Sequence, residues 1–480
     1  MSIGRDAALV TSANVLAQVL QLLALPAISA YAAPAAFGEF TLFAGLCAVV
    51  SVFAGLRYDP AIIVATSAGM ARVVARLVWS LGLAAAIACL LLVPPALVAS
   101  IASSWGRAAT LGALAAAYTL ANTSVRVAVN WLTREGQFSW VGAVQFTAVV
   151  ATVAAQLLLL HLGLDAATSL MLGLVGGQAI ATALAFGIAG RGRRWLAGFD
   201  LRRLRAAARV FVRFPQFMIV YGLNSTLRER AVHLLIGWGA GAGALGQMAM
   251  AQRLASAPHG FCHSGIGPAL MAHARSESRP EVGRTAAALM ELAALVLAPP
   301  FIFLAFNARA LIDGFLNPAW SGLAVYIQWL AVPYALVACT GFADRLFEFY
   351  GQQKEALHMD LGLSVMLLGA LGLAALSADG AVMTATFGIV LALFELFWTW
   401  RVFAANGLPL APLWRMARVT LVQMLAFAAL NGALMAIDSL VLRAAVAALA
   451  MLSMLAAHFR WLGGRRLLSR LLTRKAVTSS

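Results

Sequence analysis

Residues 138–190 read FSWVGAVQFTAVVATVAAQLLLLHLGLDAATSLMLGLVGGQAIATALAFGIAG. Asp165 is the single Asp, Glu, Lys or Arg among them, and it separates two apolar runs, 138–160 and 166–190. A helix needs about 20 mostly apolar residues to cross the hydrocarbon of a bilayer. The stretch therefore predicts two membrane-spanning helices joined by a short turn.

The rest of the chain repeats this pattern. It has 480 residues, of which 62% are hydrophobic and 11% charged, whereas soluble domains are about 45–50% apolar and about 25% charged. Fourteen windows qualify as spans, namely 8–31, 38–58, 77–100, 108–132, 138–160, 166–190, 212–238, 245–271, 285–307, 321–345, 357–377, 381–403, 419–437 and 440–459. We expect an all-α integral membrane protein.

Basic residues fall in alternate loops of this arrangement, as the positive-inside rule requires. One side receives Arg5, Arg72, Arg76, Arg134, the seven arginines from Arg191 to Arg209, Arg275, Arg279, Arg284, Lys354, Arg401, Arg415, Arg418 and the arginines and Lys475 of the tail. The other side receives Arg107, Arg309 and Arg443. We predict a multi-pass membrane protein with both termini in the cytoplasm.

Several classes of protein are excluded or disfavoured. The lysines Lys354 and Lys475 do not sit in a Gly-Lys-Ser/Thr context, so there is no phosphate-binding P-loop. His259 and His263 have a metal-like spacing without a carboxylate motif to complete it, and we expect neither a metal nor a cofactor. The net charge of +16 lies in membrane-flanking loops, so we expect no nucleic-acid partner. Short outer loops favour transport over catalysis.

The chain carries a weak internal repeat. Asn14 precedes a span and the segment Ala36-Phe37-Gly38-Glu39-Phe40, while Asn224 precedes Ala244-Leu245-Gly246-Gln247-Met248. We expect a six-helix bundle over 1–190, a basic cytoplasmic linker over 191–211, a second six-helix bundle over 212–405, two additional spans over 406–459 and a basic tail over 460–480. Parallel repeats of this kind place a transporter's substrate site in a central cavity between the halves.

The sequence also resembles the Wzx-type oligosaccharide flippases of the multidrug/oligosaccharidyl-lipid/polysaccharide exporter superfamily. The pieces that carry the resemblance are Phe37-Gly38-Glu39-Phe40, Arg57-Tyr58-Asp59-Pro60-Ala61-Ile62, Phe214-Pro215, Gly246 through Arg253 to Pro258, Trp320 and Gly351-Gln352-Gln353-Lys354. Two departures are Asp59-Pro60, where the family pattern has Glu and a non-proline residue, and the two spans beyond the common twelve. In its number of spans, fourteen, the chain resembles the lipid II flippases.

The resemblance implies a flippase that moves undecaprenyl-diphosphate-linked oligosaccharide to the outer leaflet, as in O-antigen, lipopolysaccharide or exopolysaccharide synthesis. It implies alternating access, coupling to H⁺ or Na⁺, and a monomer that works with polysaccharide assembly proteins. Alternatives are a lipid II-type flippase, a multidrug exporter of the same superfamily, or a polytopic glycan polymerase or glycosyltransferase. The last is disfavoured because the chain has no Asp-x-Asp motif.

Arginines inside spans are the candidate substrate-binding residues, because a charge in hydrocarbon is costly unless it faces protein or water. Arg228 and Arg230 lie deep in window 212–238, with Asn224 one turn before Arg228. The other candidates are Arg126, which could instead snorkel to the rim, Arg253, which could form a buried ion pair, and Arg57, which could be a rim charge beside a helix boundary at Pro60. A wholly structural charge network is the alternative for the group around Arg228.

Intramembrane acids are the candidate ion-coupling residues. Glu291 and Glu395 each stand alone in a span, and Glu229 and Asp59 complete the set. For each of them, a protonated or paired structural role is the alternative. The linker and the tail combine arginines with leucines, which is typical of helices that contact anionic membrane lipids.

Overall fold

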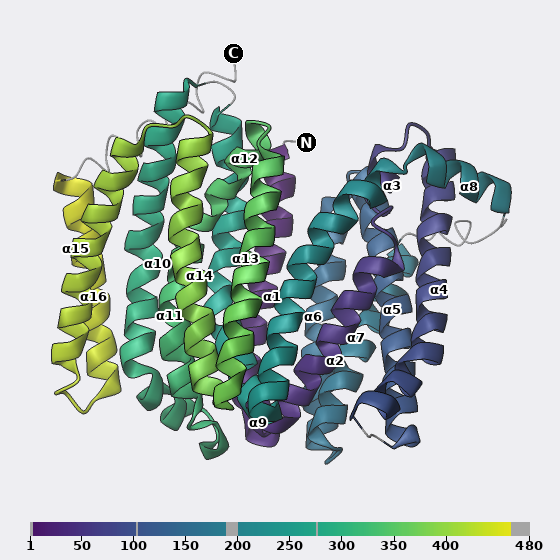
Figure 1. The fold of residues 1–480 in the computed structure, drawn as a ribbon, viewed down its shortest axis with the longest axis horizontal. Coiled ribbons are helices and arrows are strands. Elements are labelled where there is room, and N and C mark those ends of the chain that lie inside the picture. The colour runs from purple at the N-terminus through teal and green to yellow at the C-terminus, as the bar shows by residue number, and fades with distance from the viewer. Residues whose placement is uncertain (1–2, 102–103, 189–199, 275–276, 462–480) are drawn as a thin grey trace. The chain divides into compact units, whose positions relative to one another are not determined.

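The structure is a computed structural model, and it describes residues 3–101, 104–188, 200–274 and 277–461 (Figure 1). Every regular element in these ranges is a helix, which confirms the all-α prediction. The chain divides into two compact units, Met1–Ala249 and Met250–Ser480. The division falls inside the longest helix.

The first unit contains eight helices and the beginning of a ninth among its described residues. They are α1 (Ile3–Tyr31), α2 (Pro34–Ala54), α3 (Ala61–Val64), α4 (Ala68–Ile101), α5 (Trp105–Arg134), α6 (Phe138–His161), α7 (Ala166–Ile188), α8 (Leu201–Val210) and the first part of α9 (Arg213–Ala274). The long helices α4 and α5 pack together, and so do α6 and α7. The α1 helix packs against α6.

The second unit holds the remainder of α9 and the elements that follow it. They are α10 (Arg279–Phe315), η2 (Pro318–Trp320), α11 (Leu323–Thr340), η3 (Gly341–Asp344), α12 (Arg345–Phe349), α13 (Gln353–Ala374), η4 (Ala375–Ser377), α14 (Gly380–Ala405), α15 (Leu410–Leu434) and α16 (Leu440–Trp461). The α10 helix is central, because it packs against α11, α15 and α16.

The α9 helix is two membrane helices joined at a glycine. An unbroken helix of 62 residues would be about 93 Å long, three times the hydrocarbon thickness of a bilayer. Gly241 interrupts it with φ 87° and ψ 168°, a conformation open to glycine. The arms 213–240 and 242–274 correspond to the predicted windows 212–238 and 245–271.

Eleven helices in the described ranges are long and apolar enough to cross a membrane. The α1 helix has a shorter apolar part, Val15–Tyr31, and α5 carries Arg107, Arg126 and Arg134 along its 30 residues. Adding α1, α5 and the second arm of α9 brings the described long helices to fourteen, which agrees with the sequence. Several window edges were wrong. The α2 helix ends at Ala54 rather than at residue 58, α4 begins at Ala68 rather than at 77, α10 ends at Phe315 rather than at 307, and α15 begins at Leu410 rather than at 419.

The end of α2 is set by backbone geometry that hydropathy cannot report. Leu56 and Arg57 have positive φ, 44° and 55°, in the left-handed region that non-glycine residues seldom occupy. The chain turns there, passes Pro60 and forms the single turn of α3. Arg134 of α5 holds the far end of α3 by donating from Nη1 to the carbonyls of residues 62, 63 and 65, at 3.1, 3.0 and 2.6 Å.

The repeat extends beyond the segments that revealed it. The α4 helix contains Pro94-Pro95 and α10 contains Pro299-Pro300. A pair of adjacent prolines therefore lies inside the third long helix of each half. The helices that follow also end alike. Gly136 after α5 and Gly351 after α12 have φ 71° and 75°, and each lies in a helix-ending hydrogen-bond pattern.

Two glycines of the repeat lie against each other. A Cβ atom on Gly38 would lie 1.9 Å from the carbonyl oxygen of Ala242, and one on Gly246 would lie 1.8 Å from that of Pro34. Each oxygen belongs to the residue one turn before the opposite glycine, so the contact is reciprocal. The α2 helix and the second arm of α9 therefore cross at their equivalent positions, backbone against backbone.

Candidate functional site

Arg126 and Asp59 form a buried ion pair in the first unit. The guanidinium Nη2 of Arg126 contacts Asp59 Oδ1, and the side chains are 21% and 9% exposed. Nη1 of Arg126 donates to the carbonyl oxygen of Ser51 at 2.7 Å. The arginine of α5 thus holds the end of α2 and the turn that follows it. The sequence predicted substrate binding for Arg126 and ion coupling for Asp59, and the structure places the two side chains in contact.

Arg57 lies near this pair, and one of its N–H donors has no acceptor. Its Nε is buried and has no hydrogen-bond partner. Burial, with the like charge of Arg126 adding to it, lowers the pKa of the Arg57 guanidinium, while Asp59 opposes the change. One buried carboxylate therefore faces two arginines. An unsatisfied buried guanidinium N–H costs free energy, which an anionic ligand could recover.

Arg230 lies in the first arm of α9 and packs against a glycine of α2. A Cβ atom on Gly45 would lie 3.1 Å from Arg230 Cδ, so the missing side chain makes room for the arginine. Its Nη1 lies 3.3 Å from His233 Nδ1, and its Nη2 lies 3.7 Å from Glu229 Oε1. Nε of Arg230 is buried without a hydrogen-bond partner, as in Arg57. Glu229 is 59% exposed, so it neutralises Arg230 weakly.

The arginines are gathered by α2. Gly45 meets Arg230, and Ser51 and Gly55 meet Arg126, whose Nη2 would lie 3.8 Å from a Gly55 Cβ atom. Gly45 and Ser51 are separated by about 9 Å of helix. Tyr118 of α5 is close enough to both Arg230 and Arg126 for their charges to act on its phenol group. We call Arg57, Arg126 and Arg230, with Asp59 among them, the guanidinium cluster.

The guanidinium cluster is suited to a multiply charged anion. Arg57 and Arg126 are opposed by Asp59, and Arg230 by the exposed Glu229, so three cations outnumber two acids. Guanidinium groups keep their charge and present forked N–H donors that match phosphate oxygens. Asn122 of α5 adds a polar group, since its Nδ2 donates to Ser51 Oγ at 3.1 Å. The arrangement can bind a phosphate or diphosphate group.

The other predicted substrate-binding residues lie on α9. Asn224 and Arg228 are partly buried on the first arm of α9. Arg253 is exposed and belongs to the second unit. The side chains of His259, Cys262 and His263 lie outside the described residues. Among the described residues, no group of three or more His, Cys, Asp or Glu side chains could hold a metal ion.

Glu395 is buried in the second unit. It lies on α14, is 8% exposed, and its Oε1 accepts a hydrogen bond from Thr340 Oγ1 of α11 at 2.7 Å. Asp344 is close enough for its charge to act on Glu395. Two acids and a hydroxyl at adjacent helices can exchange a proton or contribute oxygens to a cation.

Glu291 of α10 belongs instead to the contact with the last two helices. Its Oε1 lies 3.6 Å from His458 Nδ1 of α16, and the charge of Arg415 of α15 reaches it. At the other end of α16, Arg443 Nη1 donates to Asn307 Oδ1 of α10 at 3.2 Å. These polar contacts join α16 to α10 at two levels, which favours the paired structural alternative for Glu291.

Sequence reasoning missed Ser51, Tyr118 and Arg134. Ser51 and Tyr118 are single polar residues in apolar runs, which usually mark nothing. Arg134 looked like an ordinary positive charge at a membrane rim, yet it binds three carbonyls. The one available signal was Arg57-Tyr58-Asp59-Pro60, because a proline three residues after an arginine and one after an acid predicts a turn that carries charge.

Comparisons with known proteins agree with the all-helical membrane fold. Residues 32–325, more than half of the chain, match the model of a family described as polysaccharide biosynthesis protein. No curated protein matches the chain.

Several solved structures share the fold. The lipid II flippase MurJ in an inward closed conformation is 12% identical, with a TM-score of 0.72 over 95% of this chain and 99% of that one. A multidrug resistance MATE family transporter in an inward-facing conformation is 14% identical, with a TM-score of 0.59 over 81% and 95%. A MOP superfamily transporter from Pyrococcus furiosus, whose binding pocket is described as reversed in polarity, is 13% identical, with a TM-score of 0.51 over 84% and 96%.

Proposed function

Because this chain belongs to the polysaccharide biosynthesis protein family, we propose that it flips an undecaprenyl-diphosphate-linked oligosaccharide from the cytoplasmic to the outer leaflet of a bacterial inner membrane. The fold is shared with the lipid II flippase MurJ and with a multidrug resistance MATE family transporter, which supports a transport function. In this proposal both termini are cytoplasmic, the protein works as a monomer with polysaccharide assembly proteins, and the product enters O-antigen or exopolysaccharide synthesis.

The guanidinium cluster is the observation that carries the proposal. A diphosphate cannot enter hydrocarbon without replacing its water by other charged or polar groups. Arg57 and Arg230 each hold a buried, unsatisfied N–H donor, and Arg126 of α5 donates to the carbonyl of Ser51 on α2. We propose that the diphosphate binds these three arginines and that Arg228 and Asn224, on the same helix arm as Arg230, contact the first sugar. Arg253 is proposed as a further cargo-binding residue.

In this proposal, Asp59 occupies the position at Arg126 that a phosphate group of the cargo would take. It is the buried carboxylate that Arg126 contacts. A diphosphate carries more charge than a carboxylate, so it would displace Asp59 from Arg126 and release the turn that carries Asp59. This exchange would link cargo binding to a movement at the end of α2.

We propose that the energy comes from an H⁺ or Na⁺ gradient through Glu395. This acid is buried, and it is held by Thr340 with Asp344 nearby. Glu291 and Glu229 are secondary candidates, because Glu291 is tied to His458 and Glu229 is exposed.

A lipid II-type flippase is the second candidate. The specific observation in its favour is that the similarity to MurJ covers 99% of that chain and 95% of this one, a range that includes the region of α15 and α16. Both candidates use the same diphosphate group, so they differ in the group that the diphosphate carries. A multidrug exporter for organic cations fits less well, because the guanidinium cluster would repel its cargo.

The proposal is tested by a leaflet assay. Purified protein is reconstituted in vesicles that contain a lipid-linked oligosaccharide, lipid II or a cationic dye, and appearance of each in the opposite leaflet is measured. We expect movement of a diphosphate-linked glycan, with loss in Arg230→Ala or Arg228→Ala. Arg309→Ala is the matched control, since Arg309 is 87% exposed and distant in sequence from the cluster. Equal rates in the wild type and both variants, or movement of the dye alone, would refute the proposal.

A further inference from the structure

The short helix α8 is built to lie on a surface. Its N-terminus is capped by Asp200, whose Oδ1 accepts from the backbone N–H groups of Arg202 and Arg203 at 2.9 and 3.4 Å. One face buries Leu204 and Ala207 against α4 and neighbouring helices. Because α4 is long and apolar enough to cross the membrane, a helix packed on its end lies at the membrane surface.

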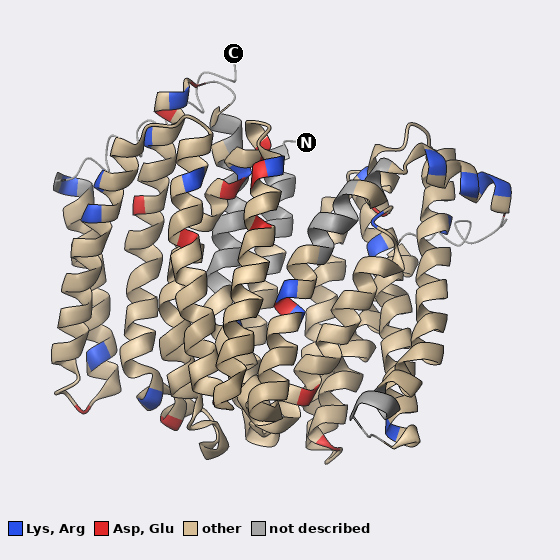
Figure 2. Cartoon of the chain, viewed as in Figure 1, with Lys and Arg blue, Asp and Glu red and all other residues tan. Residues whose placement is uncertain are grey.

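The opposite face of α8 mixes charge with apolar side chains. Arg202, Arg203, Arg205 and Arg209 are all exposed, and Figure 2 shows this end of the first unit as strongly basic. Leu201 and Val210 are 62% and 64% exposed beside them. Arginines interleaved with exposed aliphatic residues are typical of helices that bind anionic lipid headgroups and insert shallowly between them.

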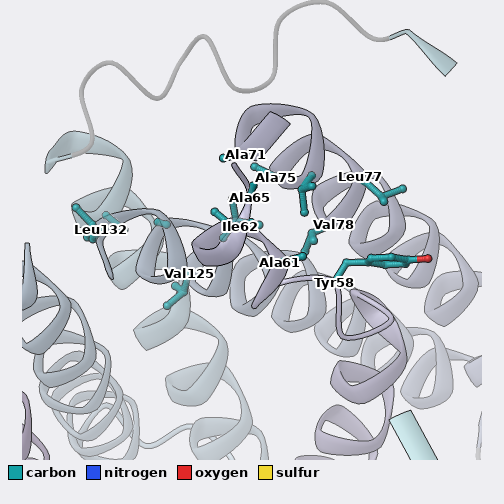
Figure 3. Packing of buried hydrophobic residues seen from close by; sticks show 14 of the residues in the cluster. Tyr58, Ala61, Ile62, Ala65, Ala71, Ala75, Leu77, Val78, Val125 and Leu132 are labelled. Atoms are coloured by element: carbon teal, nitrogen blue, oxygen red, sulfur yellow. The ribbon is translucent and has the colours of Figure 1, made fainter. Parts of the chain in front are cut away.

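A hydrogen bond connects α8 to the turn that carries the guanidinium cluster. Tyr58 Oη donates to the carbonyl oxygen of Ala208 at 3.1 Å. The Tyr58 ring is buried in the same apolar cluster as Ala61, Ile62 and Val78 (Figure 3). Its neighbours in sequence are Arg57 and Asp59. A shift of α8 can therefore be transmitted to the turn around Asp59 through the side chain of Tyr58.

We propose that the exposed face of α8 binds anionic phospholipid headgroups, and that this binding stabilises the turn at residues 55–65 through Tyr58. The lipid thereby regulates the guanidinium cluster, and the inference rests on the proposed function only in assigning this surface to the cytoplasmic leaflet. Charge complementarity selects the partner, because four arginines lie together with Asp200 as the nearest carboxylate on the helix.

The first arm of the test measures lipid contact. The exposed Ala206 of α8 is replaced by cysteine in a full chain whose Cys47, Cys89, Cys262 and Cys339 are alanine, and an environment-sensitive dye is attached. The protein is reconstituted in phosphatidylcholine nanodiscs with or without phosphatidylglycerol. We expect a blue shift with phosphatidylglycerol that high salt reverses. The shift is lost in Arg202→Gln/Arg205→Gln/Arg209→Gln and kept in the matched triple lysine variant. An equal shift in the glutamine variant, or none in the unmutated helix, overturns the proposal.

The second arm measures the connection to the turn by hydrogen exchange. The amides of Tyr58 and Ile62 donate within the turn, to the carbonyls of Gly55 and Asp59 at 3.0 and 3.1 Å. We expect phosphatidylglycerol to slow their exchange several-fold. In Tyr58→Phe the dye shift persists, but exchange at residues 55–65 no longer responds to the lipid. An unchanged response in Tyr58→Phe overturns the connection. Neither arm requires transport, so a failure here is separate from a failure of the leaflet assay.

Discussion

Arg126 of α5 and Asp59, in the turn after α2, hold each other across two helices far apart in sequence. Both side chains are largely buried, so each charge depends on the other for the solvation that water would have given it. The pair also fixes the carbonyl of Ser51, and with it the last turn of α2. The Arg126–Asp59 pair therefore connects the guanidinium cluster to the turn at residues 55–65.

Removing one member of the pair is expected to destabilise the protein more than removing both. Arg126→Gln leaves Asp59 buried without its ion-pair partner and with Arg57 as the remaining nearby cation, at a cost of about 3 kcal/mol in the free energy of unfolding. Arg126→Gln/Asp59→Asn should recover most of that loss. Unfolding in mixed detergent and SDS micelles measures the three values. Equal losses in the single and double variants would show that the pair contributes nothing as a pair.

The reciprocal glycine contact gives a second prediction. Gly38→Ala places a Cβ atom at 1.9 Å from the Ala242 carbonyl oxygen, so α2 and α9 must separate, and we expect a clear loss of thermal stability. Gly176→Ala in α7 is the matched control, because its Cβ would meet nothing within 4 Å. In that open helical position, alanine should stabilise by up to about 1 kcal/mol. Similar melting temperatures for the two variants would contradict the close crossing.

Asp165 caps the N-terminus of α7 and gives a dependence on pH. Hydrogen bonds from the backbone N–H and hydroxyl of Thr168 lower the pKa of Asp165. Because the folded-state pKa lies below the unfolded one, the stabilisation is complete above the unfolded pKa of about 4. It is lost as pH falls through the folded-state pKa. Asp165→Asn should therefore lower stability at neutral pH and flatten its decline in acid, as thermal unfolding across pH would show.

The buried acid Glu395 gives a prediction on coupling. Glu395→Gln keeps the shape and can still accept from Thr340, but it can neither release a proton nor offer a carboxylate to Na⁺. We expect cargo binding to persist while flipping loses its response to an imposed ion gradient. Glu348→Gln is a control, since Glu348 pairs with Arg345 at 3.2 Å and is 54% exposed. A gradient response that survives in Glu395→Gln would move the coupling to another acid.

Much of the fold could be predicted because hydropathy and charge act locally along the chain. The run at 138–190 folds into α6 and α7 as expected, since nothing but a lipid-spanning helix suits it. The end of α2 could not be predicted, because Leu56 and Arg57 adopt positive φ in a turn between Ser51 and Asp59, both of which are contacted by the distant Arg126. Long-range contacts of this kind leave no trace in a hydropathy window.

The candidate site was predictable in composition but not in pairing. A buried arginine is costly wherever it lies, so Arg126 and Arg230 stood out from the sequence. Which charge each one meets depends on how helices pack. The sequence suggested that Glu291 stood alone, yet His458 of α16 lies beside it. Gly45 looked like any small residue of a membrane helix until Arg230 was found against it.

Binding of the bare lipid carrier tests the central claim most directly. The affinities of undecaprenyl diphosphate and of undecaprenol, which lacks the phosphates, are measured for the wild type and for Arg57→Gln/Arg230→Gln in detergent by native mass spectrometry. Loss of charge-assisted hydrogen bonds worth about 1.5–3 kcal/mol each predicts that the double variant binds the diphosphate at least about tenfold more weakly and binds undecaprenol unchanged. If the wild type does not distinguish the two lipids, or the double variant binds the diphosphate as tightly as the wild type, the guanidinium cluster is not a diphosphate site.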